Sequence, residues 1–78
     1  FEDTVTYAGN PKTVDYSSVE FQNRPVITLQ AIDTATAQTA VVTTGTKDSV
    51  SFKLYDIENN ALAPTNQSIQ VQVTAIGV

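Results

Sequence analysis

The sequence predicts an all-β fold, a small antiparallel β-sandwich of about six strands. The clearest evidence is in residues 68–78, where polar and apolar side chains alternate almost without a break. A period of two is typical of a strand with one buried face, because successive side chains point to opposite sides. Val, Ile and Thr also make up roughly a third of the chain, and β-branched side chains suit a pleated surface better than a helix. Strand candidates recur at the regular spacing that sandwiches and barrels share.

The strands are expected, in order, over residues 4–8, 13–16, 26–33, 39–44, 49–57 and 68–78. The first of them alternates weakly and is interpreted as an edge strand or an arm. Pro25 is expected at the first residue of the third strand, where a missing N–H costs least. That strand has apolar residues on both faces, which predicts a central strand or one covered on both sides. The 49–57 and 68–78 strands alternate well and each has one clear inner face.

A single thin core follows from this alternation. Val14 and Tyr16 are expected on one face of their strand. The residues expected inside the sandwich are Ile27, Leu29, Val42, Val50, Phe52, Leu54, Ile69, Val71 and Val73. A domain of 78 residues buries only about 60% of its unfolded surface, so it benefits from a further source of stability. The chain has no Cys and no His, which removes disulfides and the usual ligands of soft metals. Oligomerisation or inclusion in a larger protein remains, with a plain monomer as the alternative.

Composition also limits the function. The net charge of −4 and the lack of a basic cluster argue against nucleic-acid binding. No apolar run approaches the roughly 18 residues of a membrane span, so no membrane insertion is expected. Without His, Cys or a Gly-rich phosphate loop, the common nucleophilic and phosphate-binding sites are missing, and we expect neither enzyme activity nor a cofactor. The chain begins at Phe1, which predicts a processed chain or a piece of a longer one.

The candidate site residues carry weaker signals. Residues 56–60 hold several oxygen ligands at alternate positions, as a Ca²⁺ loop does, but the favoured interpretation is a solvated turn, and no metal site is predicted. Tyr7, Tyr16 and Tyr55 are either sugar-stacking platforms or, as we favour, packing residues with a bonded hydroxyl. Arg24 is a carboxylate clamp, an interface anchor or a plain surface charge. The outward side chains of the last strand, Gln70, Gln72 and Thr74, complete the candidate interface.

From residue 13 onward the order of features resembles the H-type lectin domain, the sandwich found in snail agglutinin and at the ends of some phage tail proteins. The resemblance begins at residues 13–16 and continues through the Phe21-Gln22-Asn23-Arg24-Pro25 block into the next strand. It resumes at residues 51–55 and ends with the alternating strand that closes in Ala75-Ile76-Gly77. The domain organisation that it implies is an arm or edge strand over 1–12 and a lectin-like sandwich over 13–78.

The resemblance implies a homotrimer with a sugar site between neighbouring protomers. The family uses an arginine, which falls here near Ala40 or Val41, and an aromatic–histidine pair, which falls near Asn59-Asn60. Both positions depart from the family pattern, so the sugar site of the family is not expected to be intact. Tyr55, Asp56, Asn59 and Asn60 are the candidate residues for a different polar pocket.

The function expected from these observations is a non-enzymatic structural or adhesion module of a virion, at a phage tail fibre tip or on a capsid. Its expected partners are two further copies of the chain, other virion proteins and a cell-surface glycan. Two alternatives stay open. One is a carbohydrate-binding lectin domain outside a virion, extracellular or secreted, and the other is an Ig-like decoration or adhesin module that needs no trimer.

Overall fold

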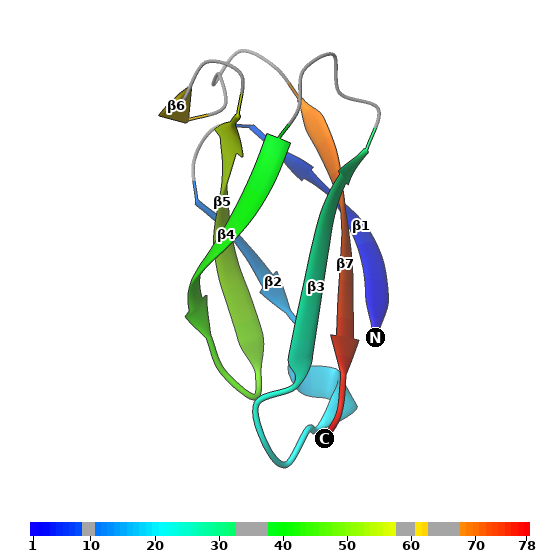
Figure 1. Ribbon diagram of the computed structural model, residues 1–78. Coiled ribbons are helices and arrows are strands. Elements are labelled where there is room, and N and C mark those ends of the chain that lie inside the picture. The colour runs from blue at the N-terminus through cyan, green and yellow to red at the C-terminus, as the bar shows by residue number, and fades with distance from the viewer. Residues whose placement is uncertain (9–10, 33–37, 58–60, 63–67) are drawn as a thin grey trace.

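The computed structural model describes residues 1–8, 11–32, 38–57, 61–62 and 68–78 (Figure 1). Apart from one 3₁₀ turn, Ser17–Val19, all regular structure in these residues is β-strand. The strands are β1 (Glu2–Tyr7), β2 (Lys12–Asp15), β3 (Val26–Ile32), β4 (Gln38–Gly45), β5 (Ser49–Asp56), β6 (Ala61–Leu62) and β7 (Ile69–Ile76). The all-β prediction is confirmed.

The strands form two antiparallel sheets. One has three strands in the order β1-β7-β3, with β7 in the centre. The other has the order β2-β5-β4, with the two-residue β6 also paired to β5. Strand β1 therefore brings residues 2–7 onto the edge of the sheet beside the C-terminal strand, and each sheet is built around one of the two strands that alternate best in the sequence.

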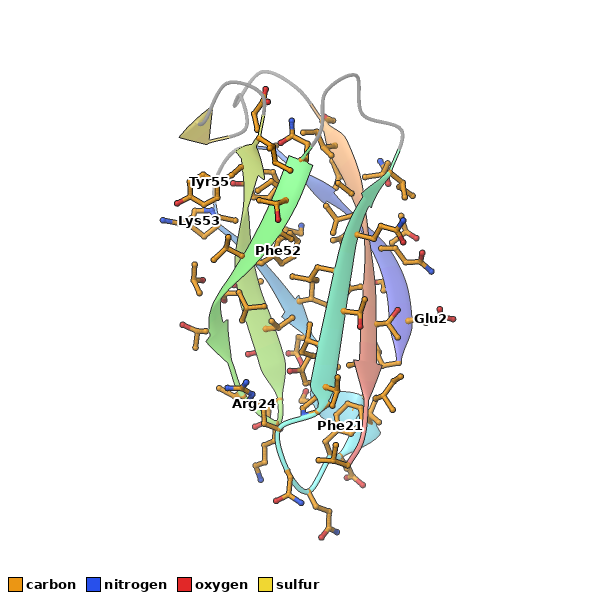
Figure 2. All side chains as sticks on the ribbon, in the orientation of Figure 1. Glu2, Phe21, Arg24, Phe52, Lys53 and Tyr55 are labelled. Atoms are coloured by element: carbon orange, nitrogen blue, oxygen red, sulfur yellow. The ribbon has the colours of Figure 1, made fainter. Side chains whose placement is uncertain are left out.

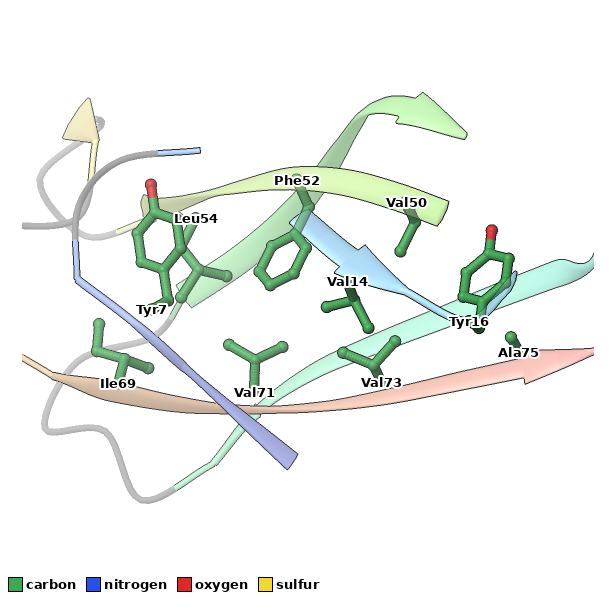
Figure 3. Packing of buried hydrophobic residues seen from close by; sticks show 10 residues of the cluster. All are labelled: Tyr7, Val14, Tyr16, Val50, Phe52, Leu54, Ile69, Val71, Val73 and Ala75. Atoms are coloured by element: carbon green, nitrogen blue, oxygen red, sulfur yellow. The ribbon is translucent and has the colours of Figure 1, made fainter. Parts of the chain in front are cut away.

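The core lies between the inner faces of the two sheets (Figure 3). The alternation of β5 and β7 is confirmed: Val50, Phe52 and Leu54 are fully buried, and the inner-face residues of β7, Ile69, Val71, Val73 and Ala75, are at most 3% exposed. Val14 on β2 and Tyr16, which directly follows this strand, are both buried in the core, as expected. The full set of buried hydrophobic residues is Tyr7, Val14, Tyr16, Val50, Phe52, Leu54, Ile69, Val71, Val73 and Ala75.

The prediction that the third strand is central or covered on both faces is wrong. Strand β3 is the end strand of its sheet and pairs with β7 alone within the described residues. Val26 is 55% exposed on its outer face, while Ile27 and Leu29 are only partly buried against the core. The apolar residues of its outer face lie at the two ends of the strand, Val26 and Ile32, with Thr28 and Gln30 between them. An apolar residue at a strand end does not require a covering layer.

Val42 was expected in the core and is 44% exposed instead. Its cross-strand partner is the fully buried Phe52, so its side chain belongs to the inner face of the sheet. The register of β4 shifts between Val42 and Thr44, which marks a β-bulge. Bulges bend a strand and increase its twist. Figure 1 shows β4 diverging from β3 toward this end. The inner face at Val42 is therefore left partly uncovered.

Candidate functional site

A hollow of about 360 Å³ opens where β3 and β4 diverge. Its lining comes from the segment that leads into β3 and from the end of β4: Arg24, Pro25, Val26, Ile27, Val42 and Gly45. The walls are mostly aliphatic, and the one charged group among the lining residues is the Arg24 guanidinium. An apolar hollow with one or a few oriented polar groups is the usual form of a small binding site.

Arg24 is exposed and reaches across to β4, although it precedes β3 in the sequence (Figure 2). A Cβ placed on Gly45 would lie 3.7 Å from Arg24 Cδ and 3.8 Å from its Nε, so the aliphatic stem of Arg24 runs over this glycine. No carboxylate in the described part of the chain forms an ion pair with Arg24. The guanidinium is thus held beside an apolar surface with its hydrogen-bonding fork open to a ligand.

The candidate interface residues Gln70, Gln72 and Thr74 lie together on the outer face of the three-stranded sheet. They alternate along β7 with core residues, and their neighbours across the sheet are mostly Thr and Gln. We call this surface the Thr/Gln face: Thr4, Thr6, Thr28, Gln30, Gln70, Gln72 and Thr74. Arg24 does not lie on it, since its side chain is held against β4. The structure therefore divides the four candidate interface residues between two surfaces.

Side-chain hydrogen bonds order one edge of the Thr/Gln face. Gln70 Nε2 donates to Thr6 Oγ1 at 3.1 Å, and Gln72 Nε2 donates to Glu2 Oε1 at 3.4 Å. Glu2 is the only charged residue of β1, β3 or β7 whose cross-strand position falls on this face. The face is consequently polar and close to uncharged.

The candidate polar pocket at the end of β5 is not assembled by the residues described. Tyr55 is 38% exposed and Asp56, the next residue of the strand, is 5% exposed, so the two side chains point to opposite faces of the sheet. Asn59 and Asn60 lie outside the described residues. Within the described part of the chain there is no group of three or more His, Cys, Asp or Glu side chains that could hold a metal ion.

The idea of Tyr7 and Tyr16 as sugar-stacking platforms is wrong, because both rings are buried in the core at 1% and 0% exposure. Tyr7 stacks on Phe52 with ring centroids 5.9 Å apart. The Tyr16 hydroxyl lies 2.6 Å from the Thr46 carbonyl oxygen and 2.9 Å from that of Ser49, and it donates to these acceptors. Burial raises the pKa of Tyr16, Asp48 adds to the shift and Arg24 opposes it. Only Tyr55 keeps an exposed ring.

A second hollow of about 380 Å³ lies at the same end of the sandwich as Arg24, over the 3₁₀ turn and the β4–β5 connection. Its lining is polar: Ser17, Glu20, Phe21, Gln22, Lys47 and Asp48. Nearby, the Asp15 carboxylate accepts a hydrogen bond from the Ser17 backbone N–H at 2.8 Å. The hydrogen bonds of Asp15 to the side chain and backbone of Ser17 lower the pKa of this carboxyl group.

The sequence indicates Arg24 as a candidate residue but not that Val42 and Gly45 are its neighbours. The Arg24-Pro25 pair was the only local signal, and the contact with β4 arises from a bulge that the sequence does not indicate. In the described residues no helix is long and apolar enough to cross a bilayer. Comparison with protein-family models, with curated proteins and with solved structures gives no match.

Proposed function

We propose that the chain is a non-enzymatic structural or adhesion module of a virion, at a tail fibre tip or on a capsid, and that it assembles as a homotrimer. The observation that carries the proposal is the Thr/Gln face. Strands β3 and β7 contain no Asp, Glu, Lys or Arg, and Glu2 is the only charged residue that β1 places on this side of the sheet. Eight acidic and four basic residues are present in the chain, so this surface is depleted of charge.

Charge depletion of this kind favours contact with another protein surface, because charged residues are rarer at the centre of an interface than on the rest of a protein's surface. The aliphatic pair Val26 and Ile76, paired across β3 and β7, extends the face at one end and is 55% and 60% exposed. Burial of these two side chains against a neighbouring copy adds hydrophobic stabilisation that a domain this small lacks. The resemblance of residues 13–78 to H-type lectin domains, which pack as trimers, supports the same arrangement.

The mass in solution tests this proposal, with native mass spectrometry or light scattering as the measurement. We expect a particle of three times the 8.4 kDa mass of the chain. Thr28→Arg places a charge at the centre of β3 on the Thr/Gln face and should dissociate the trimer. Thr39→Arg is the matched control, because Thr39 is an exposed threonine on the other end strand, β4, and lies on the outer face of the opposite sheet. A monomeric wild-type chain, or equal effects of the two substitutions, would contradict the proposal.

A glycan array separates this function from the carbohydrate-binding alternative. Tyr55 is the observation that favours sugar binding, since its ring is exposed beside Lys53 on the outer face of β5. A saturable signal on N-acetylgalactosamine or another sugar that Tyr55→Ala abolishes would favour a lectin. An array without signal, together with a trimer in solution, supports the structural module.

A further inference from the structure

We propose that the hollow between β3 and β4 is a binding site for the C-terminus of a peptide that ends in an aliphatic residue, with Arg24 binding the terminal carboxylate. The site lies off the Thr/Gln face, so the inference does not depend on the proposed trimer. Its occupant is chosen by the chemistry of the lining, which combines one exposed guanidinium with aliphatic side chains.

The charge of Arg24 is complementary to that of an anionic ligand. Arg24 is one of only four basic residues in a chain of net charge −4, and no described carboxylate pairs with it. Strands β3 and β4, which border the hollow, contain no acidic residue. A planar guanidinium binds a carboxylate through two parallel hydrogen bonds, and such charge-assisted bonds are stronger than neutral ones. An anionic ligand with the carboxylate geometry therefore fits this group.

The apolar wall specifies what is attached to that carboxylate. Pro25 is buried, and Ile27 and Val42 present partly exposed side chains on the inner faces of the two sheets. Their contact with an aliphatic group would complete the core where β3 and β4 diverge. Removal of aliphatic surface of this kind from water is favourable, so an aliphatic ligand group is preferred to a polar one.

The Arg24 guanidinium and the apolar wall lie close together, and this distinguishes a chain terminus from an internal acidic residue as the ligand. Side chains on one face of an extended peptide are two residues apart, about 7 Å, so an internal Asp or Glu and an aliphatic neighbour reach the same face only at that separation. In a C-terminal residue the carboxylate and the side chain share one Cα. The Arg24 stem and Val42 both lie 3.7 Å from the same Cβ position on Gly45, so the cation and the apolar wall are adjacent.

The free edge of β3 explains how the rest of the peptide is held. Strand β3 has one paired neighbour, β7, within the described residues, and edge strands leave every second N–H and C=O available. Arg24 precedes the start of β3, so a peptide whose carboxylate lies there runs antiparallel to β3 beside Val26 and Ile27. Strand addition at a sheet edge is a general mode of peptide recognition. The β4 edge is less suited, because its bulge between Val42 and Thr44 breaks the regular spacing of backbone groups.

Peptide binding is measured by fluorescence anisotropy with a dye-labelled hexapeptide, Ser-Thr-Ser-Thr-Ser-Val, carrying either a free carboxylate or a C-terminal amide. We expect the free acid to bind saturably with a Kd below about 1 mM, and the amide to bind about tenfold or more weakly, as the loss of a charge-assisted hydrogen bond implies. Absence of saturable binding by the free acid, or equal binding of acid and amide, would overturn the proposal.

Variants of the protein assign the effect to the hollow. Arg24→Gln should weaken binding of the acid about tenfold and abolish the difference between acid and amide. Lys47→Gln removes the same charge from the same end of the sandwich, where Lys47 lines the other hollow, and should change nothing. Equal losses in both variants would mean that only net charge matters, and would refute a site at Arg24.

Two substitutions at Val42 form a second matched pair of variants, in which Arg24 is kept. Val42→Asp places a carboxylate beside Arg24, where it competes with the peptide, whereas Val42→Asn has nearly the same shape without the charge. Both are tolerable substitutions at a side chain that is 44% exposed, and circular dichroism checks that both proteins fold. We expect the Asp variant to bind the acid at least about tenfold more weakly than the Asn variant. Equal affinities of the two variants would contradict the proposal.

Discussion

The ring of Phe21 lies directly against the backbone of Gly77. A Cβ added to Gly77 would lie 3.2 Å from Phe21 Cδ1 and 3.3 Å from Cε1, closer than side chains normally approach. Phe21 is held in this position by an edge-to-face contact with the buried Tyr16, with ring centroids 5.5 Å apart. Tyr16 in turn contacts the Phe1 ring at 5.8 Å. Gly77 thus permits an aromatic cluster to close one end of the core.

We predict that Gly77→Ala lowers the free energy of unfolding by about 1 kcal/mol, because overpacking against Phe21 outweighs the smaller entropy of the unfolded chain. In a Phe21→Ala background the same change should be neutral or stabilising by about 0.5 kcal/mol, since the obstructing ring is gone. Urea denaturation of the four proteins measures this cycle. Equal effects in both backgrounds would show that the two residues are not coupled.

Tyr16→Phe should destabilise the protein by about 1–2 kcal/mol, because it removes a buried hydroxyl that donates to the β4–β5 connection at Thr46 and Ser49. For a domain of this size a loss of 1 kcal/mol lowers the Tm by about 4–8 °C. A thermal melt at neutral pH measures the change. An unchanged Tm would mean that these hydrogen bonds stabilise the fold no more than the bonds to water that they replace.

The same hydroxyl predicts a loss of stability at alkaline pH. The pKa of Tyr16 is raised in the folded protein, first by burial, so the fold favours the neutral phenol. Its contribution is complete below the unfolded pKa of about 10 and is lost as the pH rises from there through the raised folded pKa. The gap in urea midpoint between the wild-type protein and Tyr16→Phe should therefore narrow above about pH 10. If the difference in urea midpoint between the two proteins is the same at neutral pH and above about pH 10, the raised pKa of Tyr16 is contradicted.

Tyr7→Phe is expected to act in the opposite direction. The Tyr7 side chain is 1% exposed, and its hydroxyl makes no hydrogen bond within the described part of the chain. Removing an unsatisfied buried hydroxyl should raise the free energy of unfolding by about 1 kcal/mol while the ring keeps its stacking on Phe52. Tyr55→Phe, at an exposed ring, is the control and should be near neutral. A stability loss in Tyr7→Phe would show that the hydroxyl has a partner in the folded protein.

The inner faces of the two best strands could be predicted from the sequence because burial in an antiparallel sheet repeats every second residue. Val50, Phe52 and Leu54 on β5, and the apolar residues of β7, were identified by that period alone. The period does not give the position of a strand within its sheet. Val26 and Ile32 made β3 look covered on both faces, but apolar residues at strand ends are compatible with an edge.

The candidate sites were less predictable because they depend on contacts between distant strands. Tyr55 and Asp56 are adjacent in sequence, but they lie in a predicted strand, where neighbouring side chains point to opposite faces. The neighbours of Arg24 come from β4, and the bulge that brings Val42 and Gly45 to it has no local signal. The presence of a tyrosine does not by itself indicate whether its ring is exposed for sugar stacking or buried in the core. For Tyr16, the alternation with Val14 favoured the core.

We predict that substitution of Glu20 with glycine stabilises the folded protein. It follows the 3₁₀ turn in a left-handed conformation, with φ 61° and ψ 47°, and is the only non-glycine residue of the described chain with positive φ. Its backbone N–H donates to the Ser17 carbonyl oxygen at 3.1 Å, which fixes this conformation. A Cβ costs about 1–2 kcal/mol there, and glycine avoids that cost at a smaller loss of about 0.5–1 kcal/mol in chain entropy.

Glu20→Gly should therefore raise the free energy of unfolding by about 0.5–1 kcal/mol. Asn tolerates the left-handed region better than other residues with a Cβ, and Val tolerates it worst because it is β-branched. The expected order of stability is Gly, Asn, Glu, Val, measured by urea denaturation at one pH. The side chain is exposed, so the order reflects the backbone conformation and not packing. A glycine variant less stable than the wild-type protein, or a valine variant equal to it, would show that residue 20 leaves the left-handed conformation in solution.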